Sequence, residues 1–254
     1  MTFFKWLDFT DKVIAVTGGR RGIGRALALA FAEAGAKIAV AGKSPEAAEL
    51  ESVFQKRKHD FLYIPCDLSI RDQRMNFIPK VIERYGTIDV LINNAGVQKN
   101  SSVLNYTPAQ WDSEISLMLT APFELSQQAG RIMCEKKSGK IINIASISSF
   151  QGARNIIGYS TAKHGIVGLT KCLANEFAPY QVNVNAIAPG LVKTDLAASV
   201  FNNPERAEVI RSRIPDGRFA EPEDMVGPAM FLASPMSSHI HGHVLLVDGG
   251  WMGR

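Results

Sequence analysis

The sequence predicts a single α/β domain over residues 1–254, built as a doubly wound, seven-stranded parallel sheet with helices on both faces. Two observations predict it. Short apolar runs alternate with amphipathic stretches along the whole chain, as repeated β-α-β units with right-handed crossovers require. A glycine-rich turn also joins the first apolar run to a stretch of good helix formers. With 254 residues, 46% of them hydrophobic, the chain can bury both faces of such a sheet.

Seven short runs are expected to form the strands. Each is apolar at successive positions, which is typical of parallel strands buried on both faces. The expected strands are residues 13–17, 37–41, 61–65, 88–92, 140–144, 182–187 and 244–247.

The helices are expected between these strands, where the pattern becomes amphipathic. The expected helices are residues 22–34, 45–58, 70–85, 108–120, 121–136, 159–179 and 223–233. The least regular stretch, 191–214, holds a short helix candidate near 204–213. Ligands bind at the carboxyl ends of the strands in such sheets. We therefore expect this stretch, which follows the sixth strand, to be a substrate lid.

The glycine-rich turn reads Gly18-x-x-x-Gly22-x-Gly24 and opens the first helix. Glycines let the backbone approach a diphosphate, and a helix N-terminus offers free N–H groups and a positive dipole end. The spacing differs from the G-x-G-x-x-G fingerprint of dinucleotide-binding folds, and either pattern also occurs in ordinary turns. Its position after the first strand of a domain favours a phosphate-binding loop.

A phenol, an ammonium and a hydroxyl are spaced so that they can share one proton. Tyr159 and Lys163 are four residues apart and share one face of a helix, and Ser146 lies thirteen residues before the tyrosine. A nearby cation favours the phenolate, so we expect Lys163 to lower the pKa of Tyr159 from about 10 toward working pH. That would suit a general acid or base. Tyr/Lys pairs of this spacing are also common on solvated helix faces, so the pair alone is weak evidence for catalysis. The glycine-rich turn at the other end of the chain strengthens it.

Further motifs follow in order along the chain. They are Cys66-Asp67-Leu68, Asn93-Asn94-Ala95-Gly96, Pro189-Gly190-x-x-x-Thr194 and Val247-Asp248-Gly249-Gly250. With them, the chain from about Asp11 to its C-terminus resembles the classical short-chain dehydrogenase/reductase family. The resemblance implies a Rossmann domain that binds a nicotinamide dinucleotide, and an oxidoreductase.

The resemblance also implies which residues bind the cofactor. Asp67 would hold the adenine edge, Asn94 to Gly96 would line the adenosine ribose, and Val192 and Thr194 would fix the nicotinamide amide. The full implied set is Gly18, Arg20, Arg21, Gly22, Ile23, Gly24, Lys43, Asp67, Leu68, Asn94, Ala95, Gly96, Tyr159, Lys163, Pro189, Gly190, Val192 and Thr194.

Position 42 bears on the choice of cofactor. Family members that select NAD usually have an acid there, which accepts a hydrogen bond from the ribose 2′-OH and repels a 2′-phosphate. Here the residue is Gly42, followed by Lys43, and Arg21 precedes the second glycine of the turn. The two cations could meet a 2′-phosphate from two sides, so NADP(H) is expected over NAD(H). Alternatively, both are solvated loop residues that either cofactor tolerates.

The implied reaction transfers hydride between the nicotinamide and a substrate carbonyl or alcohol. Tyr159 would be the proton donor, Lys163 would lower its pKa and bind the nicotinamide ribose, and Ser146 would bond the substrate oxygen. The family usually has an asparagine seven residues after the tryptophan of a Trp-Asp pair, here Trp111-Asp112, and this chain has Met118. A thioether cannot hold the water of the family's proton relay. Three alternatives remain open. The proton relay could run through another group such as Ser116, the enzyme could have reduced activity, or the protein could be a cofactor-binding sensor without turnover.

The second half of the chain is similar to the sugar-acid dehydrogenases of the family, which act on 2-deoxy- or 3-deoxy-gluconate and keto derivatives. The shared segments are 141–146, 149–152, 174–176, 182–190, 213–218, 227–228 and 248–254. Much of this similarity is scaffold. Arg154 could reach a substrate carboxylate or be a surface arginine, and Gln98 and Gln151 could bond hydroxyls beside Ser146.

Composition excludes several other classes. The formal charge of +4 and pI near 9.0 invite a nucleic-acid partner, but the basic clusters are short and lack an interleaved aromatic pattern. No apolar run is long enough to span a membrane, and Met1 to Asp11 is not expected to be a signal peptide. The odd, unclustered set Cys66, Cys134 and Cys172 fits a reduced, cytoplasmic setting and ordinary packing.

Three histidines alternate at His239, His241 and His243, so on an extended strand they would share a face. No carboxylate or cysteine is adjacent, and a structural or interface role is expected rather than a metal site. The resemblance further suggests a homotetramer built through the two long helices at 121–136 and 159–179.

Overall fold

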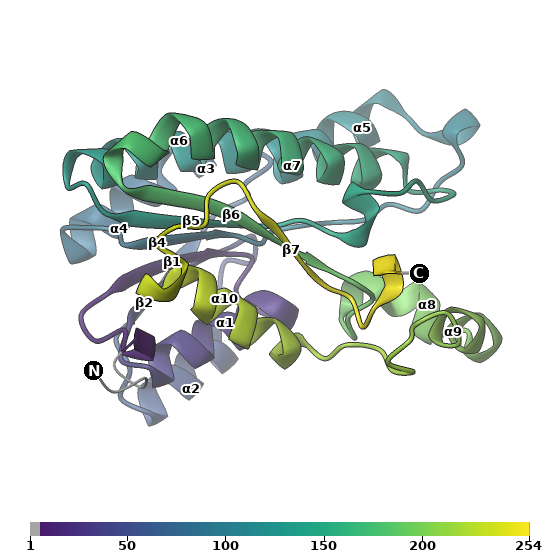
Figure 1. Ribbon diagram of the computed structural model, residues 1–254, viewed down its shortest axis with the longest axis horizontal. Helices are drawn as coiled ribbons and strands as arrows, with labels where there is room; N and C mark the ends of the chain where they lie inside the picture. Colours follow the sequence, from purple (N-terminus) through teal and green to yellow (C-terminus); the bar gives the residue numbers. More distant parts are fainter. Residues whose placement is uncertain (1–5, 254) are drawn as a thin grey trace.

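The computed structural model describes residues 6–253, so Arg254 and the start of the stretch Met1 to Asp11 lie outside it. Within that range, seven parallel strands form one sheet in the order β3-β2-β1-β4-β5-β6-β7 (Figure 1). This confirms the predicted doubly wound fold. The strands are β1 (Val13–Thr17), β2 (Lys37–Gly42), β3 (Phe61–Pro65), β4 (Val90–Asn93), β5 (Gly139–Ile144), β6 (Val182–Pro189) and β7 (Val244–Val247).

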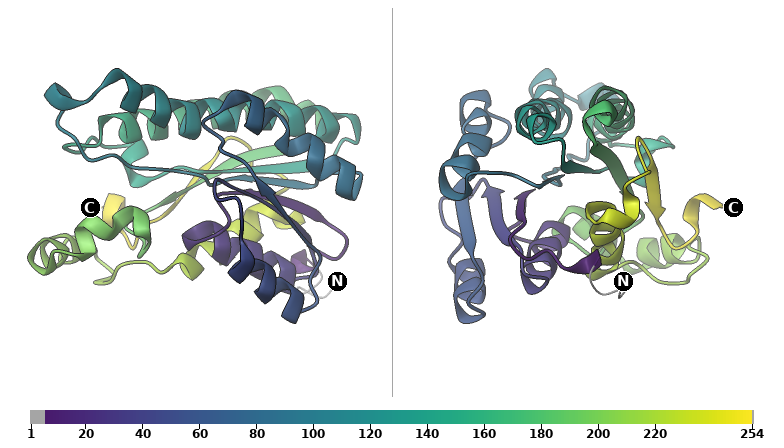
Figure 2. Two further views of the ribbon diagram at one scale, coloured as in Figure 1. Left: turned by 180° about the vertical axis from the view of Figure 1, so that it is seen from behind. Right: turned by 60° about the vertical axis from the view of Figure 1, so that its left-hand side comes forward.

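Helices cover both faces of the sheet (Figures 1 and 2). One layer contains α1 (Gly22–Glu33), α2 (Ala48–Lys56) and α10 (Val226–Ala233). The opposite layer contains α3 (Arg71–Met75), α4 (Phe77–Tyr85), α5 (Pro108–Ile115), α6 (Ala121–Glu135) and α7 (Ile157–Phe177). Successive strand residues point to opposite faces: in β1, Ile14 and Val16 pack in one core while Val13 and Ala15 pack in the other.

Proline explains where two expected helices differ from the observed ones. The stretch expected as one helix over 70–85 is divided into α3 and α4 at Asn76. Pro79 has no N–H to donate to the carbonyl of Met75, and its ring crowds that carbonyl. The stretch 108–120 ends in a π-helical turn, Ser116–Thr120, before α6. Pro122 removes the corresponding bond to Met118, which favours such a bulge.

The segment after β6 extends away from the body of the fold and carries α8 (Ala198–Phe201) and α9 (Pro204–Arg211) (Figure 1). Its two ends are joined, because Val192 forms a bridge with Ala220 and the Lys193 N–H donates to the Ala220 carbonyl at 2.8 Å. The segment is therefore anchored at its base while its helices project outward.

β1 is the point at which the strand order reverses, because it pairs with β2 on one side and β4 on the other. In open α/β sheets, ligands bind at the carboxyl ends of the strands beside this point. The sequence motifs that follow β1, β4, β5 and β6 therefore all lie at one edge of the sheet.

Candidate active site

The glycine-rich turn between β1 and α1 packs tightly against the segment after β4. Gly18 and Gly22 have φ values of +66° and +54°, in the region that favours glycine. A Cβ atom on Gly18 would stand 2.9 Å from the Ala95 Cα, and one on Gly24 would stand 2.5 Å from the Gly18 carbonyl oxygen. The turn therefore presents backbone rather than side chains, as a phosphate-binding loop must.

The N-terminus of α1 is uncapped. Its N-cap residue, Arg21, makes no side-chain hydrogen bond to the first turn, and that turn contains no acidic residue. The free N–H groups and dipole of this 12-residue helix favour an anion. Thr194 approaches the same end, with its Cγ2 3.1 Å from where a Cβ atom on Gly22 would stand. These residues fit a dinucleotide diphosphate.

Thr17 and Asn94 join β1 to the segment after β4. The Thr17 hydroxyl accepts from the N–H groups of Asn94 and Ala95, at 2.9 and 3.0 Å. The Asn94 amide donates to the carbonyls of Thr17 and Gly18, at 2.8 and 3.1 Å. These bonds fix the floor of the site where the strand order reverses.

The end of β2 has no room for the acid that favours NAD. A Cβ atom on Gly42 would stand 2.5 Å from the Tyr63 Oη. That phenol donates to the Ser44 carbonyl at 2.7 Å, which holds the ring in place. Burial raises the pKa of Tyr63 and the nearby Arg20 guanidinium opposes the rise. Arg20 and Lys43 are thus the cations near this strand end.

Arg21 and Lys43, the two cations predicted to meet a 2′-phosphate, each pair with a carboxylate. The Lys43 ammonium lies 2.8 Å from Asp67, and an Arg21 guanidinium nitrogen lies 2.7 Å from Asp195 in the segment after β6. Burial alone would raise the pKa of Asp67, but the bonds from Lys43 and Ser69 outweigh it and lower the pKa. The structure therefore does not bring Arg21 and Lys43 to one point.

The other predicted cofactor residues lie at the same edge, though several face the core. Gly190 follows β6, and a Cβ atom on it would stand 2.9 Å from the Asp248 Cα. Leu68 and Val192 are buried, and Ile23 is partly buried against the core. Their side chains pack in the core, while Pro189 ends β6 and Gly96 follows the end of β4.

Ser146, Tyr159 and Lys163 are all buried and lie after β5 and on the first turns of α7. The Ser146 hydroxyl accepts from the Ser148 N–H at 3.0 Å and also hydrogen-bonds with Tyr159. The Lys163 ammonium donates to the Ile144 carbonyl at 2.6 Å and lies 5.6 Å from the centroid of the Tyr159 ring. The structure thus brings together the three residues predicted from their spacing.

The expectation that Lys163 lowers the pKa of Tyr159 is wrong for this arrangement. Burial raises the pKa of Tyr159, a hydrogen bond from Ser146 opposes the rise, and the negative charge of Glu114 adds to it. Burial also lowers the pKa of Lys163 to about 8. Desolvation therefore dominates both groups, and Tyr159 holds its proton at neutral pH.

Met118 lies in the π-helical turn and is buried in an apolar cluster with Ile156, Tyr159 and Ala162. The position where the family has its water-binding asparagine is therefore filled with apolar groups. Ser116, suggested as another proton route, accepts from Arg74 at 3.1 Å and donates to the Ser69 carbonyl at 2.8 Å. Its hydroxyl is engaged on the side of α3 rather than with Tyr159.

The predicted substrate residues lie on different segments and differ in exposure. Gln98 lies on the segment after β4, where its amide donates to Asn100 at 3.1 Å. Gln151 is half-buried, and Arg154 is exposed in the turn before α7. Ser146 is the predicted substrate residue in contact with Tyr159.

Sequence reasoning missed two side chains beside the site, Tyr63 and Glu114. Tyr63 reaches Gly42 because β2 and β3 pair in parallel register, with Val40 opposite Tyr63. Glu114 is fully buried on α5. The sequence feature that could have identified it is its spacing, since it lies four residues before Met118 and so on the same helix face. A carboxylate on an apolar helix face is costly to bury, so it is expected to have specific hydrogen-bond partners.

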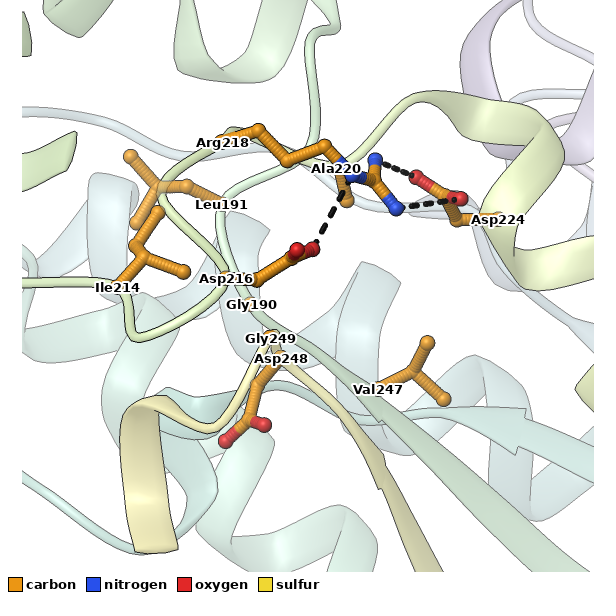
Figure 3. A pocket seen from close by; sticks show the side chains of 10 residues that line it. All are labelled: Gly190, Leu191, Ile214, Asp216, Arg218, Ala220, Asp224, Val247, Asp248 and Gly249. Carbon is orange, nitrogen blue, oxygen red and sulfur yellow. Dashed lines mark hydrogen bonds and ion pairs between the residues drawn. The ribbon is translucent and has the colours of Figure 1, made fainter. Parts of the chain in front are cut away.

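A cavity of about 130 Å³ lies beside this site, between the segment after β6 and the end of β7 (Figure 3). Within it, Arg218 lies 3.1 Å from Asp216 and 2.6 Å from Asp224. Ser146 and Tyr159 are not among its lining residues, so the cavity is not the reaction centre.

Among residues 6–253, no group of three His, Cys, Asp or Glu side chains is placed to hold a metal ion. His241 hydrogen-bonds with the Asn183 amide at 3.0 Å. Cys66 is buried, and burial raises its pKa to about 11, but Cys172 is exposed, so the expected packing role is wrong for Cys172. Within the described range, no helix is long and apolar enough to cross a membrane.

Comparisons with known proteins agree with this geometry. A family model described as enoyl-(acyl carrier protein) reductase matches residues 18–252. A 2-dehydro-3-deoxy-D-gluconate 5-dehydrogenase of Pseudoalteromonas atlantica is 42% identical over 245 residues, 96% of this chain and 96% of that protein. A 3alpha-hydroxysteroid dehydrogenase of Mediterraneibacter gnavus is 38% identical over 247 residues, 94% of this chain and 96% of that protein.

A solved structure extends the comparison to three dimensions. The crystal structure of a gluconate 5-dehydrogenase from Burkholderia cenocepacia, in complex with NADP and tartrate, superposes with a TM-score of 0.95 at 31% identity. The match covers 100% of both chains.

Proposed function

This chain belongs to the short-chain dehydrogenase/reductase family, and on that premise we propose that it is an NADP-preferring oxidoreductase of a sugar acid such as a deoxy-gluconate. It transfers hydride between the cofactor and a carbonyl or secondary alcohol. The observation that carries the proposal is the meeting of Ser146, Tyr159 and Lys163 at the same edge of the sheet as the uncapped N-terminus of α1.

The cofactor would place its diphosphate at the start of α1 and its adenosine near the end of β2. The α1 N-terminus and the Gly18 turn would hold the diphosphate by backbone N–H groups. At the adenosine end, the lack of room for an acid at Gly42, with Arg20 and Lys43 nearby, favours a 2′-phosphate. NAD(H) remains a weaker alternative, since the diphosphate contacts are the same. When bound, the nicotinamide supplies or accepts the hydride.

The protein's own residues would move the proton. Tyr159, whose pKa is raised by burial, holds a proton at neutral pH and is suited to donate it to a carbonyl oxygen during reduction. Ser146, oriented by the Ser148 N–H, would hydrogen-bond the same oxygen. The Lys163 ammonium, held by the Ile144 carbonyl, would contribute positive charge beside the ring. Oxidation would use these steps in reverse.

The substrate class rests on relatives. The Pseudoalteromonas protein is named for a keto-deoxy sugar acid and the Burkholderia structure contains tartrate, a dicarboxylic hydroxy acid. Arg154, exposed before α7, is the cation offered for such a carboxylate, with Gln98 and Gln151 for its hydroxyls. The segment 191–214, anchored at Val192 and Ala220, would be the lid.

The quaternary structure and location follow from the same premise. A homotetramer built through α6 and α7 would cover exposed apolar side chains such as Phe123 on α6. The unpaired cysteines suit the cytoplasm. A small-molecule substrate, rather than a nucleic acid or a membrane, is the expected partner.

The alternative is a cofactor-binding sensor with little turnover, which Met118 alone favours. The three relatives described above are named as dehydrogenases, which favours the enzyme. Tyr159→Phe separates the two, because it should reduce turnover at least a hundredfold while NADPH affinity is unchanged. Tyr180→Phe, at an exposed tyrosine past the end of α7, is the matched control. Equal turnover in both variants would show that Tyr159 is not the proton donor.

A further inference from the structure

Glu114, on α5, is a buried charge that the reaction described above does not use. Its residue is 0% exposed. Among the ion pairs of residues 6–253, none includes it. A buried carboxylate is costly unless hydrogen bonds satisfy it. Its hydrogen bonds therefore indicate what the fold gains from keeping it.

The Glu114 carboxylate binds two points on the segment between β4 and α5. One oxygen accepts from the Lys99 N–H at 2.7 Å, and the other accepts from the Tyr106 hydroxyl. Lys99 directly follows Gln98, on the segment that leaves β4, while Tyr106 precedes α5. One carboxylate thus fixes the segment that carries a candidate substrate residue.

The same carboxylate packs against the first turn of α7. A Cβ atom on Gly158 would clash with both the Tyr106 Oη and a Glu114 oxygen. Gly158 directly precedes Tyr159 and is buried. Glycine is therefore required where the carboxylate–phenol pair meets the helix that presents the catalytic tyrosine.

We propose that Glu114 is a positioning residue for Tyr159: its carboxylate joins the Lys99 segment, the Tyr106 phenol and the first turn of α7 into one unit. The inference rests on the proposed reaction, in which Tyr159 moves the proton. Met118 itself is surrounded by apolar side chains and offers no polar contact. The polar support for the catalytic helix comes from one helical turn earlier, at position 114.

The charge of Glu114 acts on Tyr159 as well. It adds to the effect of burial in raising the pKa of Tyr159, against the hydrogen bond from Ser146. The elements packed against Glu114 carry further titratable side chains, namely Lys99 and Tyr106 on the preceding segment, Asp112 on α5 itself, and Lys163 and His164 on α7. Removing the carboxylate charge leaves all of these in place.

Glu114→Gln tests the charge without removing the contacts. The amide oxygen can accept from the Lys99 N–H, and the amide nitrogen can donate to Tyr106. The Tyr159 phenol is titrated by its phenolate absorbance, as the difference between a protein and its Tyr159→Phe counterpart. We expect the Glu114→Gln midpoint to lie about one pH unit below wild type. The Tyr159 limb of the kcat/KM pH profile should move with it.

Asp112→Asn is the matched control, since it removes one negative charge from the exposed face of the same helix. It should leave the midpoint unchanged. Tyr106→Phe keeps the charge but loses one contact, so it should raise the substrate KM several-fold and leave the pH profile in place. An unchanged KM in Tyr106→Phe would overturn the positioning role. An unchanged midpoint in Glu114→Gln, or an equal shift in Asp112→Asn, would overturn the action of the Glu114 charge on Tyr159. The phenol titration needs no turnover, so failure of the proposed reaction is recognised separately.

Discussion

The Tyr63 hydroxyl oxygen stands 2.5 Å from the place that a Cβ atom would occupy on Gly42. The two residues lie on neighbouring strands, and the phenol is held by its bond to the Ser44 carbonyl. Any larger side chain at position 42 must displace the ring. The cofactor preference is thus tied to packing between β2 and β3 as well as to charge.

Gly42→Asp should therefore fail as a simple switch to NADH. Overpacking against Tyr63 is expected to cost about 1–3 kcal/mol of unfolding free energy, with weaker binding of both cofactors. Adding Tyr63→Ala should restore the melting temperature and favour NADH over NADPH. Melting temperatures and cofactor titrations check this. Gly227→Asp, where a Cβ atom meets nothing within 4 Å, is the control. If Gly42→Asp alone is as stable as that control, the packing argument is incorrect.

Lys43→Ala should weaken NADPH about tenfold and NADH little, because only NADPH offers a 2′-phosphate to the ammonium. The Lys43–Asp67 ion pair is largely exposed on the lysine side, so stability should hardly change. Affinities are measured by fluorescence titration at two salt concentrations, with Lys12→Ala as an exposed control. Equal losses for both cofactors would contradict the 2′-phosphate assignment.

Lys163→Met should lose activity but raise the free energy of unfolding at neutral pH. The fold lowers the pKa of this lysine from 10.5 to about 8, a penalty on the order of 3 kcal/mol for burying its charged form. Below about pH 8, Lys163 is protonated in both the folded and the unfolded protein, so the full cost of burying its charge lowers the stability of the fold. Between about pH 8 and 10.5 the unfolded chain binds the extra proton, so wild-type stability rises with pH.

The Lys163→Met variant should accordingly be more stable than wild type at pH 7, and its advantage should shrink above pH 8, as followed by denaturant unfolding. Lys140→Met provides a comparison outside the site, because burial also lowers the pKa of Lys140 to about 8. It should show the same pH trend with turnover retained. A pH-independent difference for both variants would contradict the assigned cause.

Met118→Asn should destabilise the fold rather than restore a family-like relay. The amide of the introduced asparagine would lie in the apolar cluster of Ile156 and Ala162. Leaving that amide without hydrogen-bond partners should cost about 1–3 kcal/mol. We expect a lower melting temperature and no gain in kcat, whereas Met118→Leu should be close to wild type in both. A raised kcat in the asparagine variant would show that a missing proton relay limits the wild-type enzyme.

The strands were predictable because burial on both faces leaves a continuous apolar run. The expected and observed bounds of 13–17, 61–65 and 244–247 coincide. The break at Asn76 was missed because the amphipathic pattern continues through Pro79, although the missing proline N–H prevents an unbroken helix.

The catalytic residues were predictable from spacing, but their protonation was not. An i, i+4 pair gives proximity along a helix, whereas the pKa of Tyr159 depends on burial and on Glu114, which belongs to another helix. Tyr63 was missed for the same reason, since its approach to Gly42 is set by the register of two strands. Contacts between elements distant in sequence leave little local signal.

Turnover with NADPH distinguishes an oxidoreductase from a cofactor-binding sensor. The most direct measurement follows NADPH and NADH absorbance with the purified protein across keto sugar acids, polyol ketones and simple diketones. We predict that NADPH is oxidised faster than NADH, with a keto sugar acid among the best substrates. Tight NADPH binding without oxidation by any of these carbonyl compounds would contradict the account and favour the sensor.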